Sequence, residues 1–205
     1  MTLDGLRDKS KAVAEPFAAT ALKAGIAPNQ LSVLSLIFAI ASAVLYYLSS
    51  FSSSGNLLLF IAALMVFLNA LTDLVDGALA RMTGSANFKG DFLDHIVDRY
   101  ADIFILSGIV FAGYAPWPVG FLAISGVLLT SYIGTQAQAI NFGRYYGGMM
   151  GRADRLVAII ITTFANAIYI DKIEGLPLLG WMVAVIMLSS HITALQRFGY
   201  IWKRL

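Results

Sequence analysis

The 205-residue chain contains no cysteine, so it forms no disulfide bond, and cysteine usage says nothing about the redox state of its compartment. Charged residues are also scarce, at 13% of the chain against 59% hydrophobic residues, and the mean hydropathy is +0.76. This composition excludes a soluble domain with a polar surface and predicts an integral membrane protein. The net charge of only +2 does not indicate a nucleic-acid partner.

Six apolar stretches come close to the roughly 20 residues that a membrane-spanning helix needs. They run from Leu31 to Phe51, Leu57 to Ala80, Phe92 to Ala112, Trp117 to Ile140, Leu156 to Ile170 and Leu176 to Gln196. Short segments rich in Gly, Ser and Pro separate them, and no linker indicates a second domain. We therefore predict an all-α integral membrane protein, a six-transmembrane-helix bundle in a single domain over residues 1–205, with the spans between 29 and 197.

Lysine and arginine fall almost entirely on one side of the predicted spans. That side carries Arg7, Lys9, Lys11, Lys23, Arg81, Lys89, Arg144, Arg152, Arg155, Arg197, Lys203 and Arg204, whereas the other side has only Lys172. Cytoplasmic loops of membrane proteins carry such an excess of cations. We expect a multi-pass protein of the cell membrane with both termini in the cytoplasm.

Residues 1–28 are polar and mixed in charge, so we expect no cleavable signal peptide. Their apolar side chains can share one face of a helix: Leu3, Leu6, Val13, Phe17, Ala21 and Leu22. A helix of this kind can lie along the membrane surface, and an ordinary solvated helix is the alternative. We predict an N-terminal amphipathic interfacial helix.

Four carboxylates stand out in this apolar chain. Asp73 and Asp76 are three residues apart near the end of the second span, and Asp94 and Asp98 are four apart at the start of the third. Each pair therefore lies on one helix face, and antiparallel neighbours would bring the pairs together. Because an ionised group at the bilayer centre costs about 2.5–3.5 kcal/mol, such a cluster indicates a functional site.

A divalent cation is the simplest way to offset the repulsion among these carboxylates. Sites made only of oxygen ligands suit Mg²⁺, Ca²⁺ or Mn²⁺. Two ions would fit four carboxylates, and one carboxylate could remain free as a general base. Nearby, Gly77 leaves room for a ligand against the helix, Gly90 fits either a loop-to-helix transition or close ligand approach, and Arg81 could contact a phosphate.

Other interpretations of the acidic residues remain open. We expect Asp91 and Asp102 to be structural partners, for example of Arg99. Proton and cation transporters also keep carboxylates in the membrane. No second acidic layer leads to the opposite face, however, because Asp171 and Glu174 form an isolated loop. A structural membrane protein is the third alternative.

The spacing of the whole motif resembles the signature of the CDP-alcohol phosphotransferases. The matching pattern is Asp73-x2-Asp76-Gly77-x2-Ala80-Arg81-x8-Gly90-x3-Asp94-x3-Asp98. The resemblance implies a six-span fold with an amphipathic N-terminal helix, a cytoplasmic active site and a homodimer. It also implies transfer of a lipid phosphate from a CDP-linked lipid to a small polar alcohol with release of CMP.

The resemblance also implies roles for individual residues. Asp73, Asp76 and Asp94, together with Asp98, would bind two Mg²⁺ or Mn²⁺ ions, and Asp98 would also act as the base. CDP would lie against Asp73, Gly77 and Ala80, with Arg81 and Asn29 at its phosphates. A plain helix N-cap is the alternative for Asn29. His95, off the face of the acidic pairs, is expected to be an interfacial histidine with no ligand role.

The acceptor alcohol is less closely defined. Arg152 and Arg155 resemble a segment of family members that use a phosphorylated acceptor, although both could be positive-inside anchors. Gly134 and Gln136 stand where the inositol-phosphate enzymes carry cations. Gln136 could bind hydroxyls or only join helices. Inositol phosphate and glycerol 3-phosphate are favoured, while inositol and serine stay open.

A second resemblance concerns the donor, for which both diacyl and ether lipids stay open. The sequence from Leu93 to Asp102 resembles the archaeal archaetidylinositol phosphate branch of the family, which implies an ether-lipid donor. A CDP-linked soluble head group with a lipid acceptor is a narrower alternative.

Overall fold

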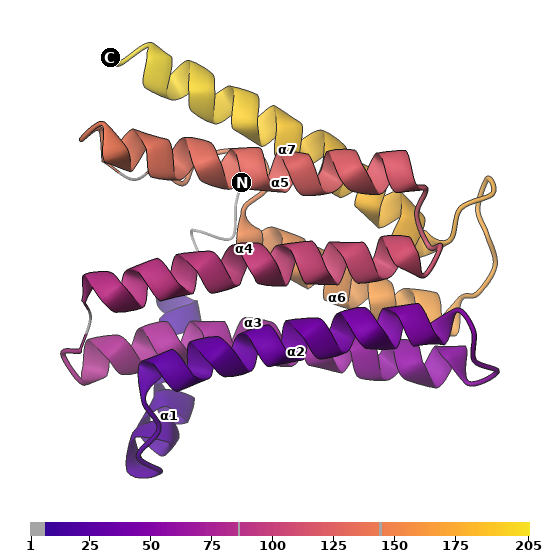
Figure 1. Ribbon diagram of the computed structural model, residues 1–205, viewed down its shortest axis with the longest axis horizontal. Coiled ribbons are helices and arrows are strands. Elements are labelled where there is room, and N and C mark those ends of the chain that lie inside the picture. Colours follow the sequence, from indigo (N-terminus) through magenta and orange to yellow (C-terminus); the bar gives the residue numbers. More distant parts are fainter. Residues whose placement is uncertain (1–6, 86, 144) are drawn as a thin grey trace.

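The computed structural model describes residues 7–85, 87–143 and 145–205, which form seven α-helices. They are α1 (Arg7–Lys23), α2 (Pro28–Ser49), α3 (Gly55–Met82), α4 (Phe88–Phe111), α5 (Trp117–Ala139), α6 (Arg152–Ile168) and α7 (Leu178–Trp202). Figure 1 shows α2 to α7 running side by side, with α1 crossing them at one end. The same end holds the turn between α3 and α4 and the carboxyl ends of α5 and α7. The all-α prediction is therefore confirmed.

Four of the described helices are long and apolar enough to cross a membrane, namely α2, α3, α5 and α7. The predicted third span, α4, is long enough but carries several charged residues along its length. The predicted fifth span, α6, has 17 residues and is about 26 Å long, short of a hydrocarbon core of about 30 Å. The chain is a multi-pass membrane protein in which these two helices differ from ordinary spans.

Small residues and polar bonds hold the helices close together. Gly108 of α4 lies against the backbone of Ala43 in α2, where a Cβ would approach the Ala43 Cα to 2.5 Å. The Asn69 side chain of α3 donates a hydrogen bond to the Ser35 carbonyl of α2 at 2.9 Å. Such close contacts suit a bilayer, where packing and hydrogen bonds rather than the hydrophobic effect join helices.

The first helix packs through alanines. Ala14, Ala18 and Ala21 are buried against α3, whereas Val13 and Phe17 are about half exposed. Ala21 therefore faces the protein and does not belong to the outward apolar face that we predicted. Of the other residues predicted there, Leu22 is exposed, and Leu3 and Leu6 lie outside the described residues.

Candidate active site

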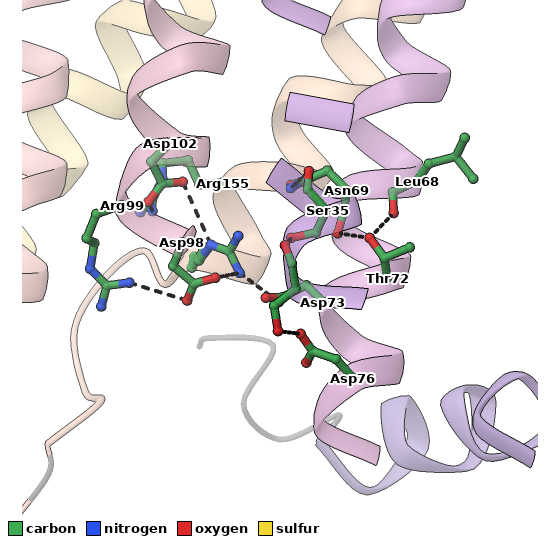
Figure 2. A network of polar contacts seen from close by, with 12 residues as sticks. Ser35, Leu68, Asn69, Thr72, Asp73, Asp76, Asp98, Arg99, Asp102 and Arg155 are labelled. Carbon is green, nitrogen blue, oxygen red and sulfur yellow. Dashed lines mark hydrogen bonds and ion pairs between the residues drawn. The ribbon is translucent and has the colours of Figure 1, made fainter. Parts of the chain in front are cut away.

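Carboxylates of α3 and α4 converge at the end of the bundle near the α3–α4 turn. One oxygen each of Asp73, Asp76 and Asp94 lies within 4.8 Å of the others, and Asp94, His95 and Asp98 form a second such group. Figure 2 shows Asp73 and Asp98 facing each other across the two helices. We predicted His95 to lie off this face, but the structure brings its ring nitrogen into the second group.

Local bonds orient these residues. The Asn87 side chain caps α4 by accepting a hydrogen bond from the Gly90 N–H at 2.9 Å, so Gly90 marks the predicted loop-to-helix transition. In α2, the Ser32 hydroxyl donates to Asp76 Oδ2 at 2.7 Å. Asp76 and Asp98 are buried, with 5% and 9% of their surface exposed. The cluster is therefore shielded from bulk water on the helix faces that form it.

Arg152 lies inside the cluster. Its Nη1 is 2.7 Å from Asp73 Oδ2 and 2.7 Å from Asp98 Oδ1. Arg99 Nη1 approaches the other oxygen of Asp98 at 3.3 Å. We predicted Arg152 as an acceptor-binding residue from a resemblance to other family members, and its contact with the acidic motif was not predicted. Arg152 offsets the repulsion between Asp73 and Asp98 and can reach either side of the cluster.

The donor set fits hard divalent cations. The two overlapping groups offer carboxylate oxygens from four aspartates and one ring nitrogen of His95, and oxygen ligands are what Mg²⁺ and Mn²⁺ prefer. Asp94 belongs to both groups, so it could contribute to two ions. The arrangement agrees with two metal positions.

A cavity of about 560 Å³ opens beside the cluster between α2, α3 and α4. Asn29, Gly77, Ala80 and Arg81, all predicted as nucleotide contacts, line it together with Asp76 and Asp94. The cavity is also lined by residues that the sequence argument missed: Ser32, Ser85, Asn87 and Tyr146.

The backbone explains two of these positions. Ala27 is the N-cap of α2, and its N–H donates to the Gln30 side chain at 2.9 Å. Asn29 therefore lies inside the first turn, and the alternative of an Asn29 N-cap is wrong. A Cβ added to Gly77 would lie 3.4 Å from Arg81 Nη1, an ordinary contact, so the arginine lies along the helix directly over Gly77 beside the cavity.

A second cavity, of about 200 Å³, lies against Asp98 between α4, α5, α6 and α7. Its cationic lining residues are Arg99, Arg152, Arg155 and Arg197. Arg197 was counted in the sequence only among the cytoplasmic cations, yet it is buried. Gln136 does not reach this cavity. It lines a separate apolar groove with Phe198 and Trp202, so the structure does not bring it to the site.

The first turn of α6 carries two of these arginines. The Gly151 N–H donates to the Asp154 side chain at 2.8 Å, which fixes the start of the helix. Arg155 Nη2 then meets Asp102 Oδ2 at 2.6 Å, with 4% and 3% of the two side chains exposed. Asp102 is thus a structural partner, as predicted, but of Arg155 rather than of Arg99.

Removing one member of this pair should destabilise the protein. We expect Arg155→Gln to reduce stability by about 3 kcal/mol, because it removes the closest cation from the buried Asp102 carboxylate and leaves only Arg152 Nε, at 3.9 Å. The apolar double variant Asp102→Leu/Arg155→Met should recover most of that loss. Thermal unfolding in detergent measures both. An unchanged unfolding temperature in Arg155→Gln would contradict a structural role for the pair.

A family model and two relatives of this chain point to the same family of proteins. The sequence model of the CDP-alcohol phosphatidyltransferase family matches residues 25–164. An archaetidylinositol phosphate synthase of Pyrococcus horikoshii is 34% identical over 203 residues, which cover 99% of this chain and 98% of that protein. A phosphatidylinositol phosphate synthase of Streptomyces avermitilis is 30% identical, with 90% of this chain and 76% of that protein covered.

Solved structures share the fold. The crystal structure of Mycobacterium tuberculosis phosphatidylinositol phosphate synthase with CDP-DAG bound superposes with a TM-score of 0.76 at 24% identity, covering 93% of this chain and 94% of that one. A second structure of the same synthase, in complex with manganese and citrate, gives a TM-score of 0.76 at 24% identity and covers 92% and 88% of the two chains.

Proposed function

Because this chain belongs to the CDP-alcohol phosphatidyltransferase family, we propose that it transfers a phosphatidyl or archaetidyl group from a CDP-linked lipid to a small polar alcohol and releases CMP. It is a transferase of membrane phospholipid synthesis. The observation that carries the proposal is the carboxylate cluster, which contributes Asp76 and Asp94 to the larger cavity and Asp98 to the smaller one. Two substrates can therefore meet at the acidic residues.

The larger cavity suits the nucleotide end of the donor. Gly77 and Ala80 present little side chain to it, which leaves space for a flat base and ribose. Arg81 and Asn29 supply hydrogen-bond donors for the diphosphate, and the planar guanidinium matches phosphate oxygens. Ser32 positions Asp76 at the boundary between this cavity and the acidic cluster.

Asp73, Asp76 and Asp94 would hold two Mg²⁺ or Mn²⁺ ions, with Asp98 beside them. When bound, the ions neutralise the diphosphate charge and polarise the phosphorus centre. Through these ions, the carboxylates would determine where the donor phosphate can lie, and their helices keep that position rigid.

Asp98 is placed to act as the general base. It lies at the wall of the smaller cavity, where its carboxylate can accept the proton of an acceptor hydroxyl. The hydroxyl oxygen then bonds to the phosphorus that carries the lipid, while the bond from that phosphorus to CMP breaks. Arg152 Nη1 lies 2.7 Å from both Asp73 and Asp98. Its positive charge can therefore stabilise negative charge at the point where the two substrates meet.

Buried cations around the smaller cavity favour an anionic acceptor. Arg152 and Arg155 line it from α6. Inositol phosphate comes first, since the relatives from Pyrococcus and Streptomyces are named for inositol phosphate products. Glycerol 3-phosphate comes second. The Pyrococcus relative favours an archaetidyl donor.

An acceptor screen tests this proposal. Purified protein with Mn²⁺ and CDP-archaeol or CDP-diacylglycerol should release CMP with inositol phosphate, less with glycerol 3-phosphate, and far less with inositol or serine. The reason is that a phosphate can accept charge-assisted hydrogen bonds from the guanidinium groups that line the smaller cavity, whereas a neutral acceptor cannot. Faster CMP release with free inositol would contradict the proposal that the acceptor is phosphorylated. No release with any acceptor would contradict the transferase function and favour ion transport.

The membrane arrangement is also a proposal. We infer that the chain has six spans, because α4 and α6 join the four apolar helices in the bundle. We also infer that α1 lies on the cytoplasmic surface through its exposed Val13 and Phe17, and that the protein is a homodimer. The absence of cysteine permits a clean test. In intact cells, Lys172→Cys should react with an impermeant maleimide and Lys203→Cys should not. The reverse pattern would invert the topology.

A further inference from the structure

The segment between α5 and α6 forms a wall shared by the two cavities. Tyr146, in the middle of this segment, lines both the 560 Å³ cavity and the 200 Å³ cavity. A residue in both walls influences how the donor phosphorus and the acceptor hydroxyl face each other. What holds Tyr146 in place is therefore relevant to the reaction.

Arg197 of α7 holds this part of the segment. Its Nη2 donates to the Tyr146 carbonyl at 3.0 Å and its Nε to the Gly147 carbonyl at 2.8 Å. Its Nη1 donates to the Thr130 carbonyl of α5 at 2.9 Å. Only 8% of Arg197 is exposed. The rigid guanidinium therefore fixes two consecutive carbonyls of the segment relative to α5 and α7.

Thr193, one turn before Arg197 on the same face of α7, holds the segment further along. Its hydroxyl oxygen accepts a hydrogen bond from the Met150 N–H at 3.1 Å. Gly148 has a φ of +136°, and a Cβ there would collide with the Thr193 side chain. The backbone of the segment thus lies directly against α7.

Tyr200 extends the same face of α7 in the other direction. The Tyr145 ring stacks on it with centroids 4.0 Å apart and planes at 8°. On α5, a Cβ at Gly134 would lie 3.2 Å from Arg197 Nη1 and 3.4 Å from the Tyr145 carbonyl oxygen. Glycine at this position lets Arg197 and the segment approach α5 closely.

We infer that Arg197 is a positioning residue, which holds Tyr146 in the shared wall through the backbone carbonyls of Tyr146 and Gly147 and so aligns the acceptor with the donor. This inference rests on the proposed transfer function. It differs from a direct role in which the Arg197 charge binds the acceptor phosphate, because three of its five N–H donors already serve backbone carbonyls.

Kinetics separate the two roles. Arg197→Lys and Arg197→Gln should both lower kcat by about 10²-fold, the cost of a misplacement of about 1 Å, with a smaller change in acceptor KM. Tyr146→Ala should do the same, and the double variant should lose little more than either single one, since the two act as one unit. The matched control is Lys203→Gln, at the exposed C-cap that follows the same helix. A loss confined to acceptor KM and largely retained by Arg197→Lys would overturn the inference.

Hydrogen exchange gives a readout that needs no activity. Amides of residues 145–151 should exchange at least about 10-fold faster in Arg197→Gln than in wild type, while those of α3 and α4 keep their rates and Mn²⁺ affinity is unchanged. Unchanged exchange in 145–151 would overturn the inference even if activity falls. If Arg197→Gln loosens the whole bundle, Arg197→Lys provides the same comparison. A wild type that releases no CMP contradicts the proposed function, and the exchange result then still tests whether Arg197 holds residues 145–151 in place.

Discussion

Replacing Asp98 with asparagine is expected to lower kcat for CMP release by about 10²–10⁴-fold, the usual contribution of a general base. Asparagine has the same shape but cannot accept a proton at neutral pH. Asp98 is 9% exposed and lines the smaller cavity, so bulk water is poorly placed to replace it. Single-turnover kinetics with saturating donor and acceptor measure the chemical step.

Two controls define this result. Asp171→Asn removes a carboxylate from the loop before α7, far along the chain from the acidic motif, and should leave kcat unchanged. Mn²⁺ affinity of Asp98→Asn should fall less than that of a variant lacking a main metal ligand. If Asp98→Asn keeps more than a tenth of wild-type kcat, another group accepts the proton.

Asp94→Asn is expected to have the larger effect on metal binding. Its carboxylate belongs to both oxygen groups, one with Asp73 and Asp76 and the other with His95 and Asp98. Because even outer partners of metal ligands are worth about 10–100-fold in affinity, losing this carboxylate should weaken Mn²⁺ binding by at least that factor. Isothermal titration of the protein without donor measures the change.

The two substitutions should differ in their response to metal. Higher Mn²⁺ concentration should restore part of the activity of Asp94→Asn, because its defect lies in affinity. It should not restore Asp98→Asn, whose defect lies in proton transfer. Wild-type Mn²⁺ affinity in Asp94→Asn would place the metal elsewhere in the molecule.

The acidic cluster could be predicted because its signal is local. Spacings of three and four residues put each pair of aspartates on one helix face, and a short turn makes α3 and α4 antiparallel neighbours. Gly77 and Arg81 follow Asp76 on the same helix and were predicted to contact a ligand beside the cluster. The structure has both residues in the wall of the larger cavity.

Residues whose position depends on distant packing could not be predicted. Arg152 reaches Asp73 across 79 residues of sequence, and Ser32 reaches Asp76 across 44. Arg197 looked like a terminal cation because nothing in its own helix indicates that carbonyls of residues 146 and 147 surround it. Gln136 was misplaced because α5 is apolar on several sides, so its sequence does not show which face meets the site.

Hydropathy was a weaker guide to α4 than to the apolar helices. Asp98 and Asp102 pair with arginines and Asp94 lines the larger cavity, and these charges set α4 apart from the four clearly apolar helices. The functional residues themselves therefore reduce the hydropathic signal of the helix that carries them.

The most direct test is a Mn²⁺ titration of CMP release by the wild-type protein, with the lipid product quantified in the same reaction. A metal-dependent transferase centred on the aspartate cluster predicts no release in EDTA, saturable release as Mn²⁺ is added, and equal amounts of CMP and phospholipid product. Transfer that proceeds at the same rate in EDTA, or CMP formed without the lipid product, would contradict this mechanism.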